Sequence, residues 1–560
     1  MAPIDFETDP SRYRHLRLEI DGEIARIVIK ADEQGGIAPG YELKLNSYDL
    51  GVDIELYDAI QRLRFSHPQV RAVVLTSGLD KVFCAGANIR MLAQAGHVQK
   101  VNFCKFTNET RNAIEEAGTD SGQAYLAAVN GNAAGGGYEL ALACDEIIMV
   151  DDGSAAVSLP EVPLLAVLPG TGGLTRLVDK RKVRKDLADV VATRSEGVRA
   201  KTALAWGLVD AIAPPSKFGQ AVLDRAQAAA AGSRRAPGGP GIELTALDRQ
   251  VSEEGLRYPN VTAAFDRATG LVTITVVGPT EEAPGSMAGA REQGAGFWPL
   301  AVTRELDDLI LWLRTNETEL GTWLIKTSGD AAVLLGYERL LAGAAGQDWL
   351  ADEIRHFAKR TLRRLDVTSR SLFALIEPGS CFAGPLAELA FACDRQFMLN
   401  GPWDDDVAPA AGQAAAQPAE LTLSAANFGA FPMSNGLTRL ASRFPGDPGH
   451  VAKLEQLTGR AIEAEEALDL GLVTFAPDDL DWEDEIRIAC EERASLSPDA
   501  LTGMEANLRF AGPETPQTKI FGRLTAWQNW VFTRPNASGP EGALRRYGTG
   551  QAGVFDRRRA

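Results

Sequence analysis

The chain repeats itself, and this internal duplication constrains its fold more than any other feature of the sequence. FALIEPGSCFAGPLAELAFACDRQFML (373–399) matches YLAAVNGNAAGGGYELALACDEIIMV (125–150), and LTLSAANFGAFPMSNGLTRL (421–440) matches SLPEVPLLAVLPGTGGLTRL (158–177). Pro432 follows Pro169 by 263 residues (432 − 169), and Leu440 follows Leu177 by the same interval. An interval of this length contains a whole domain, so the sequence predicts two related domains in tandem.

The length of 560 residues agrees with more than one domain, because a single core rarely serves so long a chain. AQAAAAGSRRAPGGPG (226–241) is rich in Ala, Gly and Pro and is typical of a linker. Residues 401–420 have no counterpart in the first repeat and are predicted to be a surface insertion. We predict a domain at 1–257, its repeat at 258–494 and a helical C-terminal extension at 495–560.

Two glycine-bearing turns in the first repeat suggest a site for a negatively charged oxygen. Gly135, Gly136 and Gly137 follow the buried strand predicted for 125–129 and precede a helix start, where bare amides and a partial positive charge meet. A second turn, 84–87 (CAGA), follows the strand predicted for 70–76. Two such turns can direct the amides of Ala87 and Gly136 at one point, as in an oxyanion hole. The alternative is that both are ordinary tight turns.

Two glutamates lie in apolar surroundings beside these turns, Glu139 in GGYELAL and Glu161 in SLPEVPLL. Burial raises the pKa of a carboxyl group and requires it to be paired or functional, so we predict acid–base catalysis by both. Either one taken alone could instead cap a helix or form a local salt bridge. Cys104 in VNFCKFTNE is a third candidate, as a proton donor or thiol contact, and its alternative is a small buried core residue.

Composition argues against several classes of function. The 57 basic and 75 acidic residues give a net charge of −18, which disfavours nucleic acid and anionic membranes as partners. The six cysteines include no CxxC pair and the five histidines no HExxH, so neither a metal site nor a disulfide framework is predicted. The sequence has no GxxxxGK[ST] loop, no signal-peptide pattern and no membrane-spanning run. We expect a cytoplasmic protein with reduced cysteines.

KVFCAGANIRML and AVNGNAAGGGYELALACD, followed by LPEVPLLAVLPGTGGLTRL and AKTALAWGLVDAI, resemble the crotonase (enoyl-CoA hydratase/isomerase) superfamily in order and spacing. The resemblance implies an α/β fold, the ββα spiral, that binds an acyl-CoA with its thioester oxygen between the amides of Ala87 and Gly136. It places the acid–base pair of the hydratases at Glu139 and Glu161. It also implies a CoA path, with two cations for the phosphates, formed by Lys44, Leu45, Ala85, Ala87, Ile89 and Arg90. Asn88 stands where the family usually has aspartate.

The second repeat lacks the groups that this chemistry needs. Pro385 stands at the position of Gly136, and proline has no N–H to donate. Glu388 stands opposite Glu139, but Ser424 stands opposite Glu161, and no CAGA turn follows 328–329. We therefore predict one catalytic centre, in the first half of the chain, and two crotonase-like domains of which the second is degenerate.

An active crotonase-like unit, a degenerate repeat and a Trp-rich tail together most resemble the benzoyl-CoA-dihydrodiol lyases (2,3-epoxybenzoyl-CoA dihydrolases) of aerobic benzoate degradation. The resemblance implies ring opening of 2,3-epoxybenzoyl-CoA, or of its dihydrodiol, with water, releasing formate and 3,4-didehydroadipyl-CoA semialdehyde. It implies no cofactor beyond the CoA of the substrate. We expect a homodimer, because two such units in one chain satisfy part of the usual oligomer interface. An ordinary enoyl-CoA hydratase or isomerase and a non-catalytic acyl-CoA binding protein are the alternatives.

Overall fold

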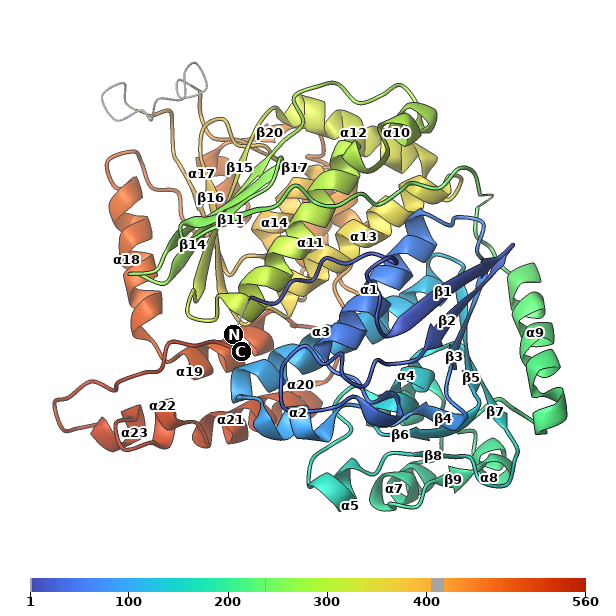
Figure 1. Ribbon diagram of the computed structural model, residues 1–560. Helices are drawn as coiled ribbons and strands as arrows, with labels where there is room; N and C mark the ends of the chain where they lie inside the picture. The colour runs from blue at the N-terminus through green and yellow to red at the C-terminus, as the bar shows by residue number, and fades with distance from the viewer. Residues whose placement is uncertain (1–2, 237, 404–416) are drawn as a thin grey trace. The chain divides into compact units, whose positions relative to one another are not determined.

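The computed structural model describes residues 3–236, 238–403 and 417–560, and the chain divides into two units (Figure 1). The N-terminal unit comprises Asp5–Thr245 and Gly346–Glu353. The C-terminal unit comprises Met1–Ile4, Ala246–Ala345 and Ile354–Ala560. The domain boundaries predicted at 257 and 494 stay predictions, and most of the predicted insertion at 401–420 lies outside the described residues.

The main sheet of the N-terminal unit has six strands in the order β1-β2-β3-β5-β7-β10. β1 and β2 form the antiparallel hairpin predicted at 15–29, and Gly22 at its turn has a φ of 60°. From β2 onward the strands run parallel. These strands are β1 (Leu16–Asp21), β2 (Ile24–Ile29), β3 (Ala72–Ser77), β5 (Ala124–Val129), β7 (Glu146–Val150) and β10 (Ala211–Ala213).

A smaller sheet, β4-β6-β8-β9, carries the glycine-bearing turns. Its strands are β4 (Lys81–Cys84), β6 (Gly131–Ala134), β8 (Ala156–Ser158) and β9 (Val198–Arg199), and the first three run parallel. The sequence interpretation missed β6, because Asn130-Gly131 resembles a turn. Gly131 instead lies so close to the backbone of Lys81 that a Cβ would collide with it. Since β4, β6 and β8 are parallel neighbours, the residues that follow them meet at one edge of the sheet.

Helices connect and cover the strands of the N-terminal unit. α1 is capped by Asp49, whose side chain accepts hydrogen bonds from the amides of Gly51 and Val52. The start of the predicted linker at 226–241 is in fact the end of α9, because alanine has the highest helix propensity. The helical elements are η1 (Lys44–Asn46), α1 (Leu50–Phe65), α2 (Ile89–Gln94), α3 (His97–Thr119), α4 (Gly136–Ala143), α5 (Glu161–Leu165), α6 (Gly173–Thr175), η2 (Arg176–Lys180), α7 (Lys185–Thr193), α8 (Ala200–Ala205) and α9 (Pro215–Ala231).

Five strands of the C-terminal unit, β13-β14-β15-β16-β18, repeat the order of β1-β2-β3-β5-β7, which supports the predicted repeat; β11 and β12 are additional, and no strand of the described residues takes the place of β10. In its main sheet, β11-β12-β13-β14-β15-β16-β18, β13 and β14 form an antiparallel hairpin and β14, β15, β16 and β18 run parallel. In its smaller sheet, β17 and β19 pair as β6 and β8 do, and no strand of the described residues corresponds to β4. The strands are β11 (Gln250–Ser252), β12 (Gly255–Arg257), β13 (Val261–Asp266), β14 (Leu271–Val277), β15 (Thr322–Ser328), β16 (Ser371–Ile376), β17 (Phe382–Ala383), β18 (Arg395–Met398), β19 (Leu421–Thr422) and β20 (Ala461–Ile462).

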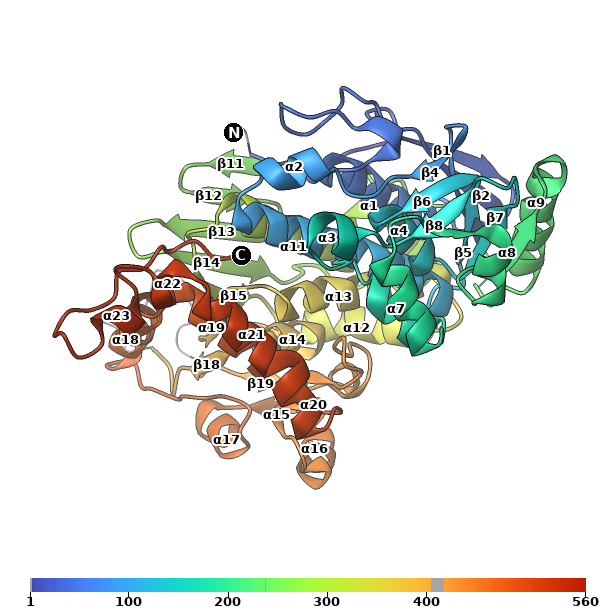
Figure 2. The ribbon, with the colours of Figure 1, turned by 90° about the horizontal axis from the view of Figure 1, so that it is seen from below.

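The predicted α/β class and the helical C-terminal region are confirmed, and Figure 2 shows the tail helices in red. Before the tail the helical elements of this unit are α10 (Met287–Gln293), η3 (Gly294–Gly296), α11 (Trp298–Asn316), α12 (Ala331–Ala344), α13 (Trp349–Asp366, which begins in the N-terminal unit), η4 (Gly384–Leu386), α14 (Ala387–Ala392), η6 (Ala425–Phe428), α15 (Arg439–Arg443), α16 (Pro448–Glu455), α17 (Ala464–Asp469) and α18 (Trp482–Ser495). The tail contains α19 (Pro498–Leu508), α20 (Pro516–Lys519), η7 (Ile520–Leu524), α21 (Thr525–Phe532), α22 (Pro535–Ser538) and α23 (Ala543–Arg546).

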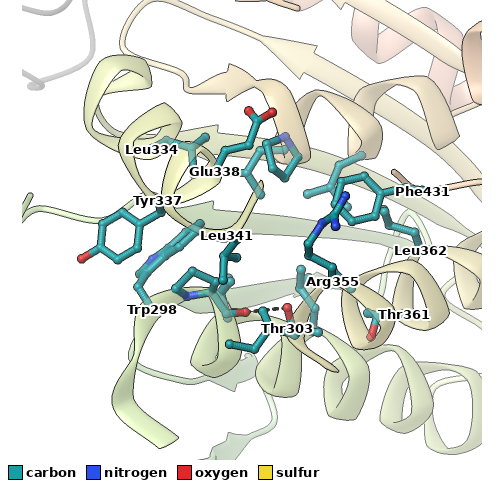
Figure 3. A pocket seen from close by; sticks show the side chains of 18 of the residues that line it. Trp298, Thr303, Leu334, Tyr337, Glu338, Leu341, Arg355, Thr361, Leu362 and Phe431 are labelled. Carbon is teal, nitrogen blue, oxygen red and sulfur yellow. Dashed lines mark hydrogen bonds between the residues drawn. The ribbon is translucent and has the colours of Figure 1, made fainter. Parts of the chain in front are cut away.

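An apolar cavity of about 80 Å³ lies between α11, α12 and α13 of the C-terminal unit (Figure 3). Most of its walls are aliphatic or aromatic, and Pro385 belongs to them. Glu338 and Arg355 are its charged lining residues. The labelled lining residues are Trp298, Thr303, Leu334, Tyr337, Glu338, Leu341, Arg355, Thr361, Leu362 and Phe431.

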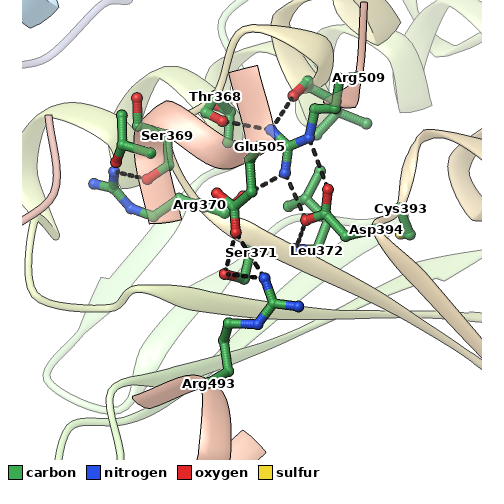
Figure 4. A network of polar contacts seen from close by, with 12 residues as sticks. Thr368, Ser369, Arg370, Ser371, Leu372, Cys393, Asp394, Arg493, Glu505 and Arg509 are labelled. Carbon is green, nitrogen blue, oxygen red and sulfur yellow. Dashed lines mark hydrogen bonds and ion pairs between the residues drawn. The ribbon is translucent and has the colours of Figure 1, made fainter. Parts of the chain in front are cut away.

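Buried ion pairs attach the tail to the main sheet of the C-terminal unit (Figure 4). Glu505 on α19 pairs with Arg493 at 3.0 Å and with Arg559 at 2.6 Å, and it accepts a hydrogen bond from the hydroxyl of Ser371 on β16. Arg509 pairs with Asp394 at 2.7 Å. Charges are tolerated in such a place only while each has its partner, because desolvation is costly.

We expect Glu505→Gln to lower the free energy of unfolding by about 3–5 kcal/mol, because it leaves Arg493 and Arg559 buried without their counter-charge. Urea denaturation followed by circular dichroism measures the change. Glu514→Gln is the matched control in the same tail, since its pair with Arg523 is partly exposed and should contribute less than about 1 kcal/mol. Equal stability of the two variants would contradict the anchoring role of Glu505.

Candidate active site

The ends of β4, β6 and β8 bring the predicted site residues into contact. The turn after β4 touches the turn after β6, since a Cβ built on Gly86 would lie 2.7 Å from the amide nitrogen of Gly136. The turn after β6 touches the residue that follows β8, since a Cβ on Gly135 would lie 2.7 Å from Oε1 of Glu161. Gly86 and Gly135 have φ values of 87° and 53°, which L side chains rarely adopt. Glycine at both positions therefore permits the assembly.

The amides of Ala87 and Gly136 lie side by side without acceptors. Gly136 is the first residue of α4, so its N–H has no acceptor in the helix. Within the described part of the chain neither amide donates a hydrogen bond. A Cβ on Gly136 would lie 3.2 Å from the nitrogen of Ala87. This arrangement is able to bind an oxyanion, and the assignment of the two amides to a thioester oxygen stays a prediction.

Glu139 is held by three hydrogen-bond donors from a neighbouring loop. Its Oε1 accepts from the amides of Thr171 at 3.0 Å and Gly173 at 2.8 Å, and its Oε2 accepts from the hydroxyl of Thr171. Arg176 fixes this loop, because it donates to the carbonyl of Thr171 at 2.7 Å and pairs with Glu115 on α3 at 2.9 Å. The side chain of Glu139 is buried. Three donors stabilise a carboxylate in one orientation.

Glu161, the first residue of α5, has a different environment. It is buried, and its Oε2 has no hydrogen-bond partner among the described residues. Burial, and to a lesser degree the charge of Glu139, raises the pKa of Glu161 to about 7. A carboxyl group with this pKa gains and loses a proton near neutral pH, as a general acid or base must. The surroundings of the two glutamates thus differ: donors of a neighbouring loop hold Glu139 in place, whereas Glu161 titrates near neutral pH.

We expect Glu161→Gln to increase the free energy of unfolding at about pH 8 more than at about pH 4, by about 3 kcal/mol. The folded pKa of about 7 lies above the ordinary value of 4.5, so the native state binds the extra proton and its stability falls as pH rises between these values. Glutamine does not titrate and escapes this loss. Thermal melts across this pH range measure the difference, and Glu196→Gln, at an exposed position of the same unit, should show none.

Cys104 lies half-buried on α3. Burial, followed by the charges of Glu139 and Asp53, raises the pKa of its thiol. The thiol is therefore protonated at neutral pH and can donate a proton or a hydrogen bond, whereas a nucleophilic cysteine needs a lowered pKa. A protonated thiol is compatible with both functional roles predicted for Cys104, a proton donor and a thiol contact, and the choice between them stays a prediction.

The residues predicted for the CoA path share one exposed strip formed by η1 and the turn after β4. The amide of Ala85 donates to the carbonyl of Leu45 at 3.0 Å and joins the two segments. Leu45 and Ile89 are both 56% exposed, which is unusual for large apolar side chains. Lys44 forms an exposed pair with Glu42 at 2.6 Å, and Arg90 is exposed nearby. Exposed pairs are weak, so the ammonium group can exchange partners. The CoA contacts themselves stay predictions.

Asn88, which departs from the pattern of the superfamily, forms hydrogen bonds within the N-terminal unit. Its Oδ1 caps α2 by accepting from the amide of Met91, and its Nδ2 donates to the carbonyl of Glu42 at 2.8 Å and to Ser47 at 3.1 Å. An ionised aspartate could not make the bond to the carbonyl of Glu42, because a carboxylate has no donor. Asparagine here therefore ties the turn of Ala87 to the segment that carries Lys44.

The sequence interpretation did not assign Thr171, Gly173 and Arg176, although it quoted the stretch PGTGGLTRL that contains them. The only local signal was the run of glycines, and Gly172 does have a φ of 88°. Their role depends on a loop that meets α4 from 32 residues away. Tyr48, whose hydroxyl lies against Gly136, was also missed.

The corresponding positions of the C-terminal unit are occupied by internal contacts. Glu388 pairs with Arg439 at 3.1 Å and accepts from Asn427 at 2.8 Å. Ser424 donates to Glu338 at 2.6 Å, and the carboxylate of Glu338 lies against Gly384 as that of Glu161 lies against Gly135. Pro385 lines the apolar cavity of Figure 3. These contacts support the prediction of a single centre.

No group of three or more His, Cys, Asp or Glu side chains in residues 3–236, 238–403 and 417–560 is arranged to hold a metal ion. No helix in the same ranges is long and apolar enough to cross a membrane. All six cysteines carry free thiols.

Several known proteins and one family model match only part of this chain. The enoyl-CoA hydratase/isomerase family model matches residues 42–237. A solved structure of an enoyl-CoA hydratase from Bacillus anthracis is 27% identical, with a TM-score of 0.34, over 39% of this chain and 77% of that one. The fatty acid oxidation complex subunit alpha of Pseudomonas syringae pv. tomato is 31% identical over 52% of this chain, which spans only 41% of that relative.

One relative matches along its whole length. The benzoyl-CoA-dihydrodiol lyase of Aromatoleum evansii is 54% identical over 553 residues, which cover 99% of this chain and 97% of that protein. The match includes the C-terminal unit and the tail, beyond the residues that the hydratase/isomerase family model covers. The chain belongs to the benzoyl-CoA-dihydrodiol lyase family of the crotonase (enoyl-CoA hydratase/isomerase) superfamily.

Proposed function

We propose that this protein is a carbon–carbon lyase that opens the ring of 2,3-epoxybenzoyl-CoA, or of its dihydrodiol, with water in benzoate degradation. The products are formate and 3,4-didehydroadipyl-CoA semialdehyde. One observation carries the proposal. At the ends of three parallel strands, two amides without acceptors among the described residues lie beside two carboxyl groups, those of Glu139 and Glu161, whose environments differ. The full-length identity of 54% to a benzoyl-CoA-dihydrodiol lyase selects this reaction among those of the superfamily.

The amides of Ala87 and Gly136 supply the electrostatic part of the mechanism. Cleavage of a ring carbon–carbon bond leaves an electron pair that the thioester can take up as an enolate. The negative charge then develops on the thioester oxygen, which these two N–H groups are placed to bind. Donors fixed before the reaction stabilise such a charge most effectively, because they need no reorganisation.

The two glutamates and Cys104 supply the proton transfers. Glu161 titrates near neutral pH, so we assign to it the activation of water and the return of the proton. To Glu139, fixed by Thr171 and Gly173, we assign the orientation of the water. Cys104, protonated and within electrostatic reach of Glu139, is assigned as a proton donor to the opening ring.

The reaction as proposed needs no group beyond the CoA of the substrate. The enolate provides the electron sink, and water provides the oxygen atoms of formate and aldehyde that the substrate does not already hold. Lys44 and Arg90 would bind the CoA phosphates at the exposed strip. Dialysis against a chelator is expected to leave the rate of formate release unchanged.

Parallel assays with two substrates test the proposal. The purified protein is incubated with 2,3-epoxybenzoyl-CoA, and formate is measured with a formate dehydrogenase coupled assay. Hydration of crotonyl-CoA is followed by loss of its enoyl absorbance. We expect formate from the first and little hydration of the second. Rapid hydration without formate would establish an ordinary hydratase, and no turnover of either with retained benzoyl-CoA binding would establish a binding protein.

We further propose that the protein acts in the cytoplasm as a homodimer. The free thiols and the acyl-CoA substrate support the compartment. The presence of two related units in one chain supports a small oligomer, since the second unit can replace part of the interface of a larger one. Light scattering after size exclusion should give twice the mass of the chain, and a trimer or hexamer would contradict this.

A further inference from the structure

The backbone of Tyr48, in the segment after η1, pairs with the turn that presents the amide of Ala87. Its backbone N–H donates to the carbonyl of Gly86 at 2.9 Å, and its carbonyl accepts from the amide of Asn88 at 2.8 Å. These two bonds enclose Ala87 and leave its own N–H without an acceptor. The backbone of Tyr48 therefore fixes the position of one of the two donors assigned to the oxyanion.

The hydroxyl of Tyr48 lies at the same place as these two donors. A Cβ built on Gly136 would overlap with Oη of Tyr48 and would lie 3.2 Å from the nitrogen of Ala87. The residue is only 2% exposed, and Oη has no hydrogen-bond partner among the described residues. A buried hydroxyl without a partner is costly, so such a group calls for an acceptor that arrives with a ligand.

The buried ion pair of Arg111 and Asp53 packs against the ring of Tyr48. The guanidinium of Arg111 lies 5.0 Å from the ring centroid, and Phe103 packs at 6.0 Å between centroids. Arg111 is paired with Asp53, which also accepts from the hydroxyl of Thr107 at 2.6 Å. A cation over the ring face and the packing around it fix the orientation of the phenol. The hydroxyl cannot turn toward solvent without breaking these contacts.

Burial raises the pKa of the Tyr48 hydroxyl well above its ordinary value, so the group is a neutral O–H at any pH at which the protein works. Its neighbours at Ala87 and Gly136 are donors as well. These three donors lie close together, and none of them has an acceptor among the described residues, which favours a negatively charged oxygen of a ligand as their partner. A phenylalanine would fill the same volume without the cost of the buried hydroxyl.

We propose that the hydroxyl of Tyr48 is a third hydrogen-bond donor to the substrate oxygen that the amides of Ala87 and Gly136 bind, which makes Tyr48 a catalytic residue. The inference rests on the proposed acyl-CoA site, but it does not depend on which ring the enzyme opens. Its consequence is that the oxyanion is bound by one side chain in addition to two backbone groups.

Tyr48→Phe tests the proposal, with Tyr125→Phe as the matched control. Tyr125 is equally buried in the same unit, and its hydroxyl also lacks a partner, but it lies near Arg64 and Glu353. We expect Tyr48→Phe to lower kcat by about 10²-fold with KM changed by less than about 3-fold, as for loss of one oxyanion donor. Tyr125→Phe should keep the kcat of the wild type. Equal kcat values for the two variants would overturn the proposal.

A spectroscopic measurement separates this inference from the identity of the reaction. Benzoyl-CoA labelled with ¹³C at the thioester carbonyl is bound to each protein, and its carbonyl band is recorded by difference infrared spectroscopy. Hydrogen bonds to the oxygen lower the frequency of the band, so Tyr48→Phe should show a smaller shift than the wild type and Tyr125→Phe the full one. The same shift in all three proteins would overturn the proposal. The comparison holds even if the wild type releases no formate, which would overturn only the assigned reaction.

Discussion

Replacing Glu161 with glutamine is expected to lower kcat for formate release by about 10²- to 10⁴-fold, the usual contribution of a general acid or base. The physical reason is its environment: burial and the charge of Glu139 place its pKa at about 7, whereas glutamine neither accepts nor donates a proton. The profile of kcat/KM against pH should contain an ionisation near this value in the wild type. Glu161→Gln should lack it.

Glu338→Gln is the matched control for this experiment. Glu338 lies against Gly384 in the C-terminal unit as Glu161 lies against Gly135, and its pKa is also raised by burial. It has no oxyanion turn beside it, because Pro385 takes the place of Gly136. The control should keep the rate of the wild type. A normal rate in Glu161→Gln, or a comparable loss in Glu338→Gln, would show that Glu161 does not transfer the proton.

Gly136→Pro is expected to reduce kcat by at least about 10²- to 10³-fold, because it introduces into the first unit the residue that the second one already has. Proline removes the N–H of the oxyanion donor, and it also adds a Cβ that would overlap with Oη of Tyr48, so the contribution of the N–H is the difference between Gly136→Pro and Gly136→Ala. The helix itself should persist, since Gly136 is the first residue of α4 and proline is favoured there. Formate release measures the loss, and circular dichroism verifies the fold.

Two further variants show which property of Gly136 matters. Gly136→Ala keeps the amide, but its Cβ would overlap with Oη of Tyr48, so we expect a partial loss of activity. Pro385→Gly restores an N–H in the C-terminal unit and should produce no second centre, because Ser424 stands opposite Glu161 there. Full activity of Gly136→Pro would mean that the amide does not bind the substrate oxygen.

Much of the fold followed from local patterns. The hairpin at β1–β2, the helix α1 and the strands β3 and β5 were predicted, since each depends on alternation or helical spacing within a short segment. The duplication predicted two similar sheets, and the strand orders of the two units agree over five strands, β1-β2-β3-β5-β7 and β13-β14-β15-β16-β18. The errors were also local in origin: Asn130-Gly131 concealed β6, and alanines at the end of α9 resembled a linker.

By itself the sequence determined the components of the site. Gly136 and Pro385 occupy the same position in the two repeats, and only glycine has a backbone N–H. The sequence alone therefore decides which unit can donate a hydrogen bond there, because the N–H is a covalent property of the residue. The apolar neighbours of Glu139 and Glu161 predicted two buried carboxyl groups, and the structure has both. The predicted roles of these residues are for the experiments above to decide.

Only the tertiary structure decided how these components differ. Glu139 is anchored because a loop fixed by Arg176 brings three donors to it, whereas no donor of the described residues reaches Oε2 of Glu161. The hydroxyl of Tyr48 became a candidate because the chain folds its ring between Arg111 and Gly136. Protonation and hydrogen-bonding capacity depend on neighbours brought from distant segments, and no local pattern in the sequence records those neighbours.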